Sequence, residues 1–311
     1  MNRIFFYMLA AVVLTTACDK EKSIPKMTMT TQKVGGLTII LAGSGKVTID
    51  WGDGSKKEEH TLSEFYTTWT SEHRFSHSYA SGLVRTISIT GENVTHLSCF
   101  DIGLTSLEIG QNVALTHLYC SRNQLSSLNV ISNIALTTLY CYDNQIGNLD
   151  VSRNSKLKTL YCGPNKLKIL DVSKNSELEV LYCGSNQFTS LDVSKNSNLN
   201  TLICDGNQIN NLNVKGLTKL KNLNCGRYTY TPEGLGNHLT SLDVSGCTSL
   251  STLNCENNLL TIESLNVLFG TLHENTISSG KDIFISHNPG AEGCDKSIAE
   301  NKGWWVAIRS E

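Results

Sequence analysis

The sequence predicts a β-rich solenoid with little helix, preceded by a small β domain and followed by a cap. Three observations lead to this fold class. A motif recurs with a period of 21 residues from Val94 to about Val267. Each copy holds two short runs in which apolar and polar residues alternate, as in strands buried on one face. The segments on both sides lack the motif, and with 311 residues and 40% hydrophobic content the chain can bury such a core.

The first 26 residues indicate export and anchoring. Arg3 precedes an apolar run from Ile4 to Leu14, which is too short for a stable spanning helix. The stretch LTTAC resembles a bacterial lipobox, which implies a signal peptide at 1–17 and a lipid on Cys18, with 18–26 as a tether. An ordinary signal peptide that leaves Cys18 free is the alternative. We therefore expect a lipid-anchored protein of the cell envelope, at the outer membrane.

Residues 27–93 predict a small β domain. Strands are expected in MTMTTQ, GLTIIL, KVTIDW, RFSHSY and VRTISIT, whereas the stretch 58–72 fits no strand. The run WGDGS at Trp51, followed by HSY at His77, resembles the signatures of PKD-like domains, and this resemblance implies a β-sandwich. A metal site formed by His60, His73 and His77 with Asp53, or a hydrolase that uses these histidines, is an alternative, but histidines near turns are usually surface residues. We expect no metal and no cofactor.

The repeat has the pattern L-x-x-L-x-C-x-x-N-x-L-x-x-L-D-V-S-x-N-x-x, whose positions we number as slots 1 to 21. It resembles the leucine-rich repeat, in the bacterial form with 21 residues, over residues 94–267. That resemblance implies a solenoid with two short parallel strands in each turn, which must stack because neither strand can bury its face alone. The copies begin at Val94, Leu115, Leu136, Leu157, Leu178, Leu199, Leu220 and Leu250.

Asparagine marks two corners of each turn. Its side chain bonds to nearby backbone, so stacked asparagines are expected to satisfy inward-facing peptide groups. In the seventh copy nine extra residues intervene and Tyr228 takes the asparagine slot, so we expect a remodelled corner there. The asparagines are Asn123, Asn144, Asn165, Asn186, Asn207 and Asn258 in slot 9, and Asn112, Asn133, Asn154, Asn175 and Asn196 in slot 19.

Slot 6 holds a cysteine in every copy. Stacked strands place these residues about 4.8 Å apart with parallel Cβ vectors, whereas a disulfide prefers a Cβ separation of about 3.8 Å. We interpret this cysteine row as reduced, buried thiols that act as small hydrophobic residues. A stack of disulfides, a thiolate metal array and a nucleophilic cysteine remain alternatives. The row comprises Cys99, Cys120, Cys141, Cys162, Cys183, Cys204, Cys225 and Cys255, while Cys247 and Cys294 lie outside it.

Slot 5 points outward between two buried slots and predicts an aromatic stripe. Tyrosine combines a large contact area with a polar tip, so we predict a ligand-binding surface. Gly163 and Gly184 in slot 7 are expected to leave the ring faces uncovered. Strand packing between stacked rings is an equally weighted alternative. The candidate binding residues are Tyr119, Tyr140, Tyr161 and Tyr182 in slot 5, with Tyr142, His117 and Phe100 beside them.

Slot 15 repeats acidic or amide residues, among them Asp150, Asp171 and Asp192. A row of carboxylates is compatible with calcium. A basic residue follows each aspartate by three positions, so a solvated row of alternating charge is the favoured interpretation.

Residues 268–311 predict the cap that a solenoid needs to cover its last turn. The stretch 295–302 predicts a short helix, and Trp304 with Trp305 is expected to cover the final rung.

The residues together predict a binding module without enzymatic activity. No nucleophile, acid–base pair, phosphate loop or cofactor motif stands out, and Lys and Arg (26) nearly balance Asp and Glu (28), which argues against nucleic acid as a partner. The leucine-rich repeat resemblance implies a protein ligand on the strand face. A carbohydrate ligand in a glycan-capture system is the alternative, because aromatic rings also stack on sugars.

Overall fold

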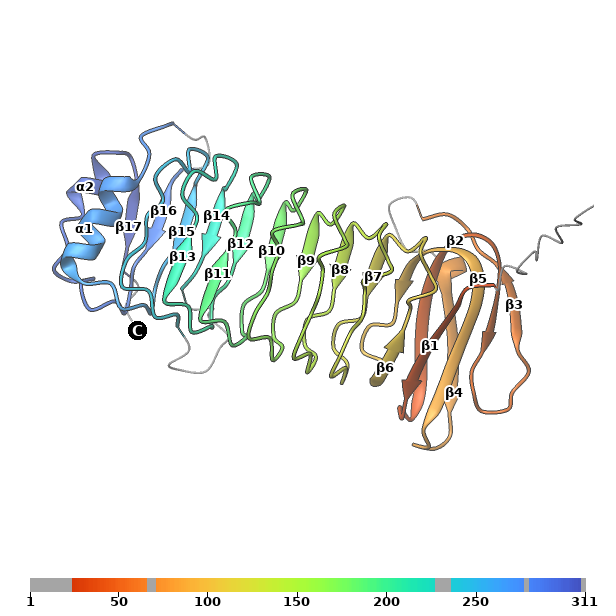
Figure 1. Ribbon diagram of the computed structural model, residues 1–311. Coiled ribbons are helices and arrows are strands. Elements are labelled where there is room, and N and C mark those ends of the chain that lie inside the picture. Colours follow the sequence, from red (N-terminus) through yellow and green to blue (C-terminus); the bar gives the residue numbers. More distant parts are fainter. Residues whose placement is uncertain (1–23, 66–70, 227–235, 277–279, 309–311) are drawn as a thin grey trace, which may run out of the picture.

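The chain folds as an elongated leucine-rich repeat solenoid, shown by a computed structural model that describes residues 24–65, 71–226, 236–276 and 280–308. A β domain forms one end, short parallel strands follow one another along the length, and two helices lie at the other end (Figure 1). Among the described residues, no helix combines the length and the apolar character needed to cross a membrane.

The N-terminal domain is built from antiparallel strands. One long strand, β2, covers most of both expected strands and the residues 42–45 between them, with irregular pairing near Ala42 and Ser44. Residues 58–61, where no strand was expected, pair with β2 as β3 because their backbone completes its exposed edge. The elements are β1 (Lys26–Thr31), β2 (Gly35–Asp50), β3 (Glu58–Thr61), the 3₁₀ turn η1 (Ser71–His73), β4 (Arg74–Tyr79) and β5 (Arg85–Ser98).

Strand β5 joins the domain to the solenoid. Arg85–Thr90 pairs with β1 and Ser88–Ser98 pairs with β2, while His96–Ser98 at its end also pairs in parallel with β7 (His117–Tyr119) of the next turn. Strand β6 (Leu104–Glu108) of the first turn also pairs with β1. The expected boundary between residues 93 and 94 therefore lies inside one continuous strand, and the two parts share one sheet.

Each solenoid turn contributes one three-residue strand from slots 3 to 5. Neighbouring strands are parallel and in register, so side chains of equal slot stand beside each other. After β7 they are β8 (Thr138–Tyr140), β9 (Thr159–Tyr161), β10 (Val180–Tyr182), β12 (Thr201–Ile203), β14 (Asn222–Asn224) and β15 (Thr252–Asn254).

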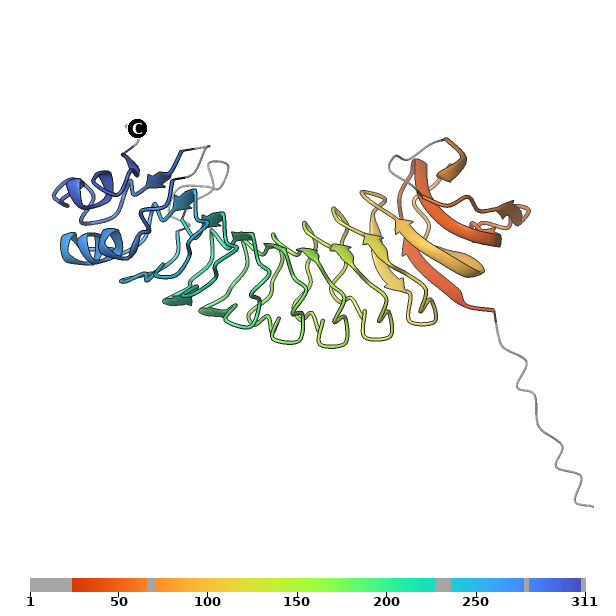
Figure 2. The same cartoon turned by 90° about the horizontal axis from the view of Figure 1, so that it is seen from above.

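Among the described residues, the second strand of the turn is regular in the first turn, as β6, and in two neighbouring turns farther along, as β11 (Ser190–Asp192) and β13 (Asn211–Asn213). The turns follow a shallow arc with the first strands on its inner side (Figure 2). Turns on the outer side of an arc lie farther apart than the spacing of about 4.8 Å that a hydrogen-bonded ladder needs. The other turns keep the buried leucine and valine of this segment without the ladder, as Leu128 and Val130 show.

The core consists of rows that run the length of the solenoid. Leucine in slots 1 and 4, cysteine in slot 6 and the apolar residues of slots 11, 14 and 16 are buried in turn after turn. Slot-9 asparagines close the corner between them. For example, Asn186 accepts from the Leu167 backbone N–H at 3.0 Å and donates to the Cys162 and Cys183 carbonyls. This confirms that these asparagines satisfy inward-facing backbone groups.

Beyond the nine-residue insertion, the corner keeps the hydrogen bonds of a slot-9 asparagine. Asn237, beyond the insertion, donates to the carbonyls of Cys204 and Cys225, and its Oδ1 accepts from the Ile209 N–H at 3.0 Å. Asn237 thus takes the role of a slot-9 asparagine, while residues 227–235 lie outside the described part of the chain. Tyr228 lies outside the described residues.

The solenoid continues past the last copy found in the sequence. Strands β16 (Asp282–Phe284) and β17 (Trp305–Ala307) extend the parallel sheet beyond β15. Ile285 takes the buried cysteine slot, and Asn288 donates to Cys255 O and accepts from Leu260 N as a slot-9 asparagine does. The region predicted as a cap therefore contains further turns. The repeat pattern does not reveal them, because other residues take the slots of Leu and Cys.

Two helices cover the C-terminal end. Helix α1 (Ile262–Thr271) was not expected; Thr261 caps it by accepting from the Ser264 N–H, and Leu265, Leu268 and Phe269 are buried. Helix α2 (Ser297–Glu300) lies inside the predicted stretch 295–302. Trp304 is 2% exposed and packs as expected, but Trp305 is 62% exposed, because successive residues of a strand face opposite sides.

Candidate functional site

The four slot-5 tyrosines form one column along the inner side of the arc, which we call the tyrosine column. Tyr140 and Tyr161 have ring centroids 4.3 Å apart and planes at 28°, and Tyr161 and Tyr182 are 4.2 Å apart at 9°. Tyr119 meets Tyr140 edge to face at 5.1 Å. The parallel register of β7 to β10 imposes this arrangement, since it places equal slots one strand spacing apart.

The stacked rings cover one another's faces, so the expectation of uncovered faces beside Gly163 and Gly184 is wrong. The two glycines are required by close packing instead. A Cβ on Gly163 would stand 2.5 Å from the Gly184 carbonyl oxygen, and one on Gly184 would stand 2.5 Å from Asp205 Oδ1. The column therefore offers ring edges and hydroxyl groups to a ligand. Burial, with neighbouring tyrosines, raises the pKa of Tyr161, which keeps its hydroxyl protonated.

His117 extends the aromatic surface toward the N-terminal domain. It stacks on His96 with centroids 4.1 Å apart and lies 6.3 Å from the Tyr119 ring, while Phe65 contacts His96 at 4.8 Å. Burial lowers the pKa of both imidazoles, that of His96 to about 4. This end of the surface is therefore uncharged at neutral pH.

Phe100 and Tyr142 form a second, smaller aromatic pair in slot 7. Their ring centroids are 6.4 Å apart, and Phe100 is 41% exposed. The Arg122 guanidinium lies 5.6 Å from the Phe100 ring centroid and pairs with Asp143 at 3.6 Å. The candidate residues thus form a main column and an adjacent pair.

The cysteine row lies directly beneath the column and is closed to solvent. All ten cysteines of the described residues are free thiols, and Cys294 alone among them is partly exposed. Burial raises the pKa of Cys99, Cys141 and Cys225 to about 12, so these thiols stay protonated and are not nucleophiles. Within the described part of the chain, no three His, Cys, Asp or Glu side chains gather as a metal site. Cys18 lies outside the described residues.

The slot-15 aspartates stabilise the outer turns. Asp150, Asp171 and Asp192 each accept from the backbone N–H of the serine two residues later, at 2.8 to 2.9 Å. These bonds lower their carboxyl pKa values. The basic residues three positions on make no ion pair with them within the described residues, whereas Lys215 and Asp243 pair at 3.2 Å. Each of these aspartates therefore closes a tight turn through its hydrogen bond to the backbone, and salt bridges contribute little to the slot-15 row.

The motif residues of the N-terminal domain form a compact polar cluster. His77 Nε2 lies 2.7 Å from Asp53 Oδ2, its ring stacks on Trp51, and the Tyr79 hydroxyl donates to the Trp51 carbonyl. The predicted turn at Asp53 is formed, with positive φ at the flanking Gly52 and Gly54. These contacts join the WGDG turn to β4.

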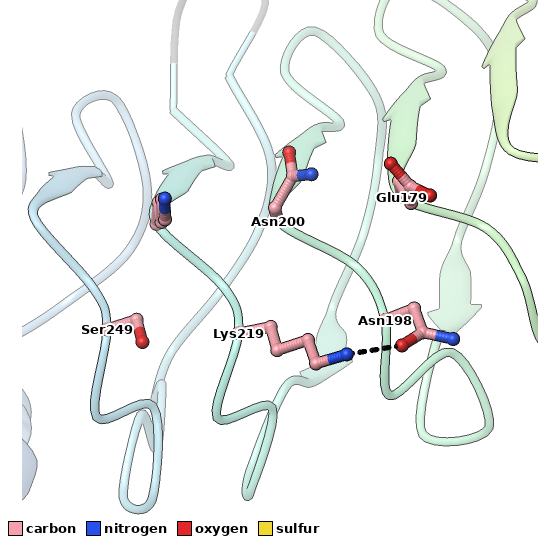
Figure 3. A pocket seen from close by; sticks show the side chains of 6 residues that line it. Glu179, Asn198, Asn200, Lys219 and Ser249 are labelled. Atoms are coloured by element: carbon pink, nitrogen blue, oxygen red, sulfur yellow. Dashed lines mark hydrogen bonds between the residues drawn. The ribbon is translucent and has the colours of Figure 1, made fainter.

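Sequence reasoning missed two polar features. A shallow hollow of about 390 Å³ has Lys219 donating to Asn198 at 2.7 Å across neighbouring turns (Figure 3). Its other lining residues are Glu179, Asn200, Lys221 and Ser249. Asp205, in the turn after the last tyrosine of the column, is a buried carboxylate with 4% exposure. Its place in slot 7, between Gly184 and Gly226, was the signal that could have found it.

Comparisons with known proteins find leucine-rich repeat proteins among the similar solved structures. No family model and no curated sequence matches the chain. The functional domain of InlJ from Listeria monocytogenes, which includes a cysteine ladder, is 24% identical over 75% of this chain and 58% of that one, with a TM-score of 0.48. A leucine-rich repeat protein of Leptospira interrogans is 20% identical over 65% and 56%, with a TM-score of 0.49.

Internalin C2 from Listeria monocytogenes is 21% identical over 70% of this chain and 81% of that chain, with a TM-score of 0.46. The chain thus spans a little over half the length of the first two neighbours. At these identities the likeness concerns the repeat fold alone, and it identifies no ligand.

Proposed function

We propose that this chain is a non-enzymatic binding module of the bacterial cell envelope that recognises a protein ligand through its strand face. The observation that carries the proposal is the tyrosine column on the inner side of the arc. Aromatic side chains held rigidly by their neighbours lose little conformational freedom on binding, which favours their use as contact residues. His117, Phe100 and Tyr142 enlarge the same surface.

The ring stacking favours a protein over a carbohydrate. A sugar packs its C–H groups on an open aromatic face, but Tyr140 and Tyr161 have both faces against neighbouring rings. The exposed edges and hydroxyl groups suit the mixed polar and apolar surface of a protein. A non-enzymatic role agrees with the protonated, buried thiols and with the structural use of the WGDG cluster.

Anchoring through a lipid on Cys18 is the second part of the proposal, and it rests on the LTTAC sequence. Cells fed labelled palmitate should incorporate label into the wild-type chain and not into Cys18→Ser. The substituted protein should also leave the membrane fraction. Label in the Cys18→Ser chain, or wild-type protein in the cytosolic fraction, contradicts the anchor and the envelope location.

The binding role is tested with the soluble chain that lacks the anchor, residues 19–311, against a variant of it with all four column tyrosines changed to serine. A ligand captured from envelope or host-matrix extract is identified, purified and titrated against both proteins. We expect a loss of about a hundredfold or more in affinity, as the removal of several contact residues produces. The matched control changes Asp150, Asp171 and Asp192 on the outer side to asparagine and should keep full affinity. Equal affinity of all three proteins would refute the role of the column.

A further inference from the structure

The polar hollow of Figure 3 adjoins the strand face where the tyrosine column ends. Glu179, Asn200 and Lys221 line it from slot 2, directly before β10, β12 and β14 in three successive turns. Slot 21 supplies Asn198 and Lys219. Strand β10 also carries the last ring of the column. A ligand segment that lies along the strand face can therefore extend into this hollow of about 390 Å³.

Backbone hydrogen bonds between the turns fix the order of the slot-2 side chains. The Asn200 N–H donates to the Glu179 carbonyl, and the Lys221 N–H donates to the Asn200 carbonyl, both at 2.8 Å. Neighbouring slot-2 residues thus stand about 4.8 Å apart, which places Lys221 roughly 9.6 Å from Glu179 along the sheet. The glutamate is therefore one full turn too far away to neutralise that lysine.

The hollow has an excess of positive charge. Glu179 is paired with Lys158 on its other side, at 3.6 Å. The Lys219 ammonium donates to the neutral Oδ1 of Asn198 at 2.7 Å. Within the described residues, neither Lys219 nor Lys221 has an ion pair with a carboxylate. Two exposed ammonium groups in neighbouring slots therefore stand without a counter-ion at one end of the hollow.

The uncharged groups of the hollow add a hydrogen-bond donor. The Oδ1 of Asn200 accepts from the Thr201 hydroxyl at 2.9 Å. Its Nδ2 donates no hydrogen bond within the described residues, so this N–H group is open to a ligand. Ammonium and amide donors suit a carboxylate, which has only acceptor oxygens. The six lining residues include no aromatic ring on which a sugar could stack.

We propose that this hollow binds an aspartate or glutamate side chain of the protein ligand, through Lys219, Lys221 and the Asn200 amide. The tyrosine column supplies contact area over β7 to β10, and the hollow selects for negative charge beyond its end. Exposed ion pairs add little affinity individually, so the main effect of the hollow is on the choice and register of the ligand. This inference rests on the proposed protein-binding function.

The test is a selection of random peptides displayed on phage against the soluble chain, residues 19–311. Wild type is compared with the double variant Lys219→Gln, Lys221→Gln. The matched control, Lys174→Gln with Lys195→Gln, removes two exposed lysines of slot 18 and so the same charge away from the hollow. We expect wild type and control to enrich peptides with an acidic residue at one fixed position. The hollow variant should lose that preference and bind these peptides about tenfold more weakly.

A reversal of charge on both partners distinguishes direct contact from indirect effects. Peptides whose fixed acidic residue is changed to lysine should bind wild type about tenfold more weakly, and the double variant Lys219→Glu, Lys221→Glu should restore their affinity. Raising the salt concentration should weaken the binding of the original peptides to wild type more than to the glutamine variant. Failure of the reversed pair to recover affinity would overturn the contact.

The outcomes separate this inference from the function on which it rests. Enriched peptides without a fixed acidic residue, or equal affinity of the hollow variant and the control, overturn the carboxylate site and leave the binding function standing. No enrichment by any of the proteins overturns both. Retention of polygalacturonate by wild type and not by the hollow variant, without an acidic preference among peptides, would assign the hollow to an acidic sugar and overturn the proposal.

Discussion

The cysteine row and the tyrosine column come from adjacent slots of the same turns, yet they have opposite environments. Slot 6 is fully buried in every copy, and burial raises the thiol pKa values. Slot 5 is half-buried and stacks ring on ring on the inner side of the arc. One residue of strand alternation thus separates a row that holds the turns together from a row that can contact a ligand. Removing a buried slot-6 side chain should therefore lower the stability of the fold, and removing a slot-5 tyrosine should lower the affinity for the ligand.

The largest loss of stability is expected from Asn186→Ala. Its loss leaves the Leu167 N–H without a partner and removes bonds to the carbonyls of Cys162, Cys183 and Gly184. Unsatisfied buried groups of this kind are each worth about 1 to 3 kcal/mol, so we expect unfolding to become easier by about 3 to 5 kcal/mol. Denaturant unfolding measures the difference.

Asn196→Ala, in slot 19, is the matched control for that substitution. Asn196 donates to the carbonyls of Val172 and Asn175, which also accept from the backbone N–H groups of Asn175 and Leu178. Its Oδ1 has no partner. We expect a cost of about 1 to 2 kcal/mol. Equal losses at both corners would show that slot-9 bonding is not what joins the turns.

Asp205→Asn should stabilise the protein at neutral pH. The folded-state pKa of about 6 exceeds the reference value of 3.8, so the folded state holds its proton more tightly. The contribution of Asp205 to the free energy of unfolding is then highest below about pH 4 and falls as pH rises through 6. The total fall is about 3 kcal/mol, because the pKa is shifted by roughly two units. The substitution removes this loss, so its gain in melting temperature should be full at pH 7 and vanish near pH 4. A gain that does not depend on pH would contradict a buried charge.

Cys162→Ser tests the row beneath the column. A hydroxyl replaces a weakly polar thiol at a site with no exposure, and we expect a loss of about 1 to 3 kcal/mol. Cys162→Ala removes the same sulfur without adding a polar group and should cost no more. A serine variant as stable as wild type would mean that slot 6 does not need an apolar side chain.

Only a small change in stability is expected for Tyr161→Ser. The substitution removes two stacked contacts, worth about 1 kcal/mol each at most, while its effect on ligand affinity should be large. Tyr119→Ser, where one ring meets its neighbour edge to face, should cost less. A large loss of stability at Tyr161 with unchanged ligand affinity would assign the column to strand packing.

Much of the fold was predictable because repetition exposes it. One substitution pattern repeated eight times fixes which slots are buried, and the structure confirms this for leucine, cysteine and asparagine. The prediction failed where the chain keeps the geometry of the repeat but has other residues in the slots of the repeat pattern. Ile285 and Asn288 build a further turn without the leucine and cysteine signature, and Asn237 restores a corner after the insertion.

The candidate site was predicted in its residues and not in its geometry. Slot alternation placed the tyrosines outside, but only the stack shows that their faces are closed and their edges are open. Trp305 shows the same limit, because adjacent Trp304 and Trp305 have equal hydrophobicity and opposite environments. Asp205 was overlooked because its burial, and the lack of a counter-ion among the described residues, depend on the side chains of neighbouring turns.

By itself, then, the sequence determined the period, the inner and outer slots and the chemistry of each row, since these follow from local alternation repeated along the chain. The tertiary structure decided what depends on distances between turns. Those features are the arc and its inner face, the shared strand that joins the β domain to the solenoid, the ring contacts and the isolation of Asp205. The physical reason is that hydrogen bonding fixes the spacing of the turns, and that spacing determines which side chains cover one another and which remain open to a ligand.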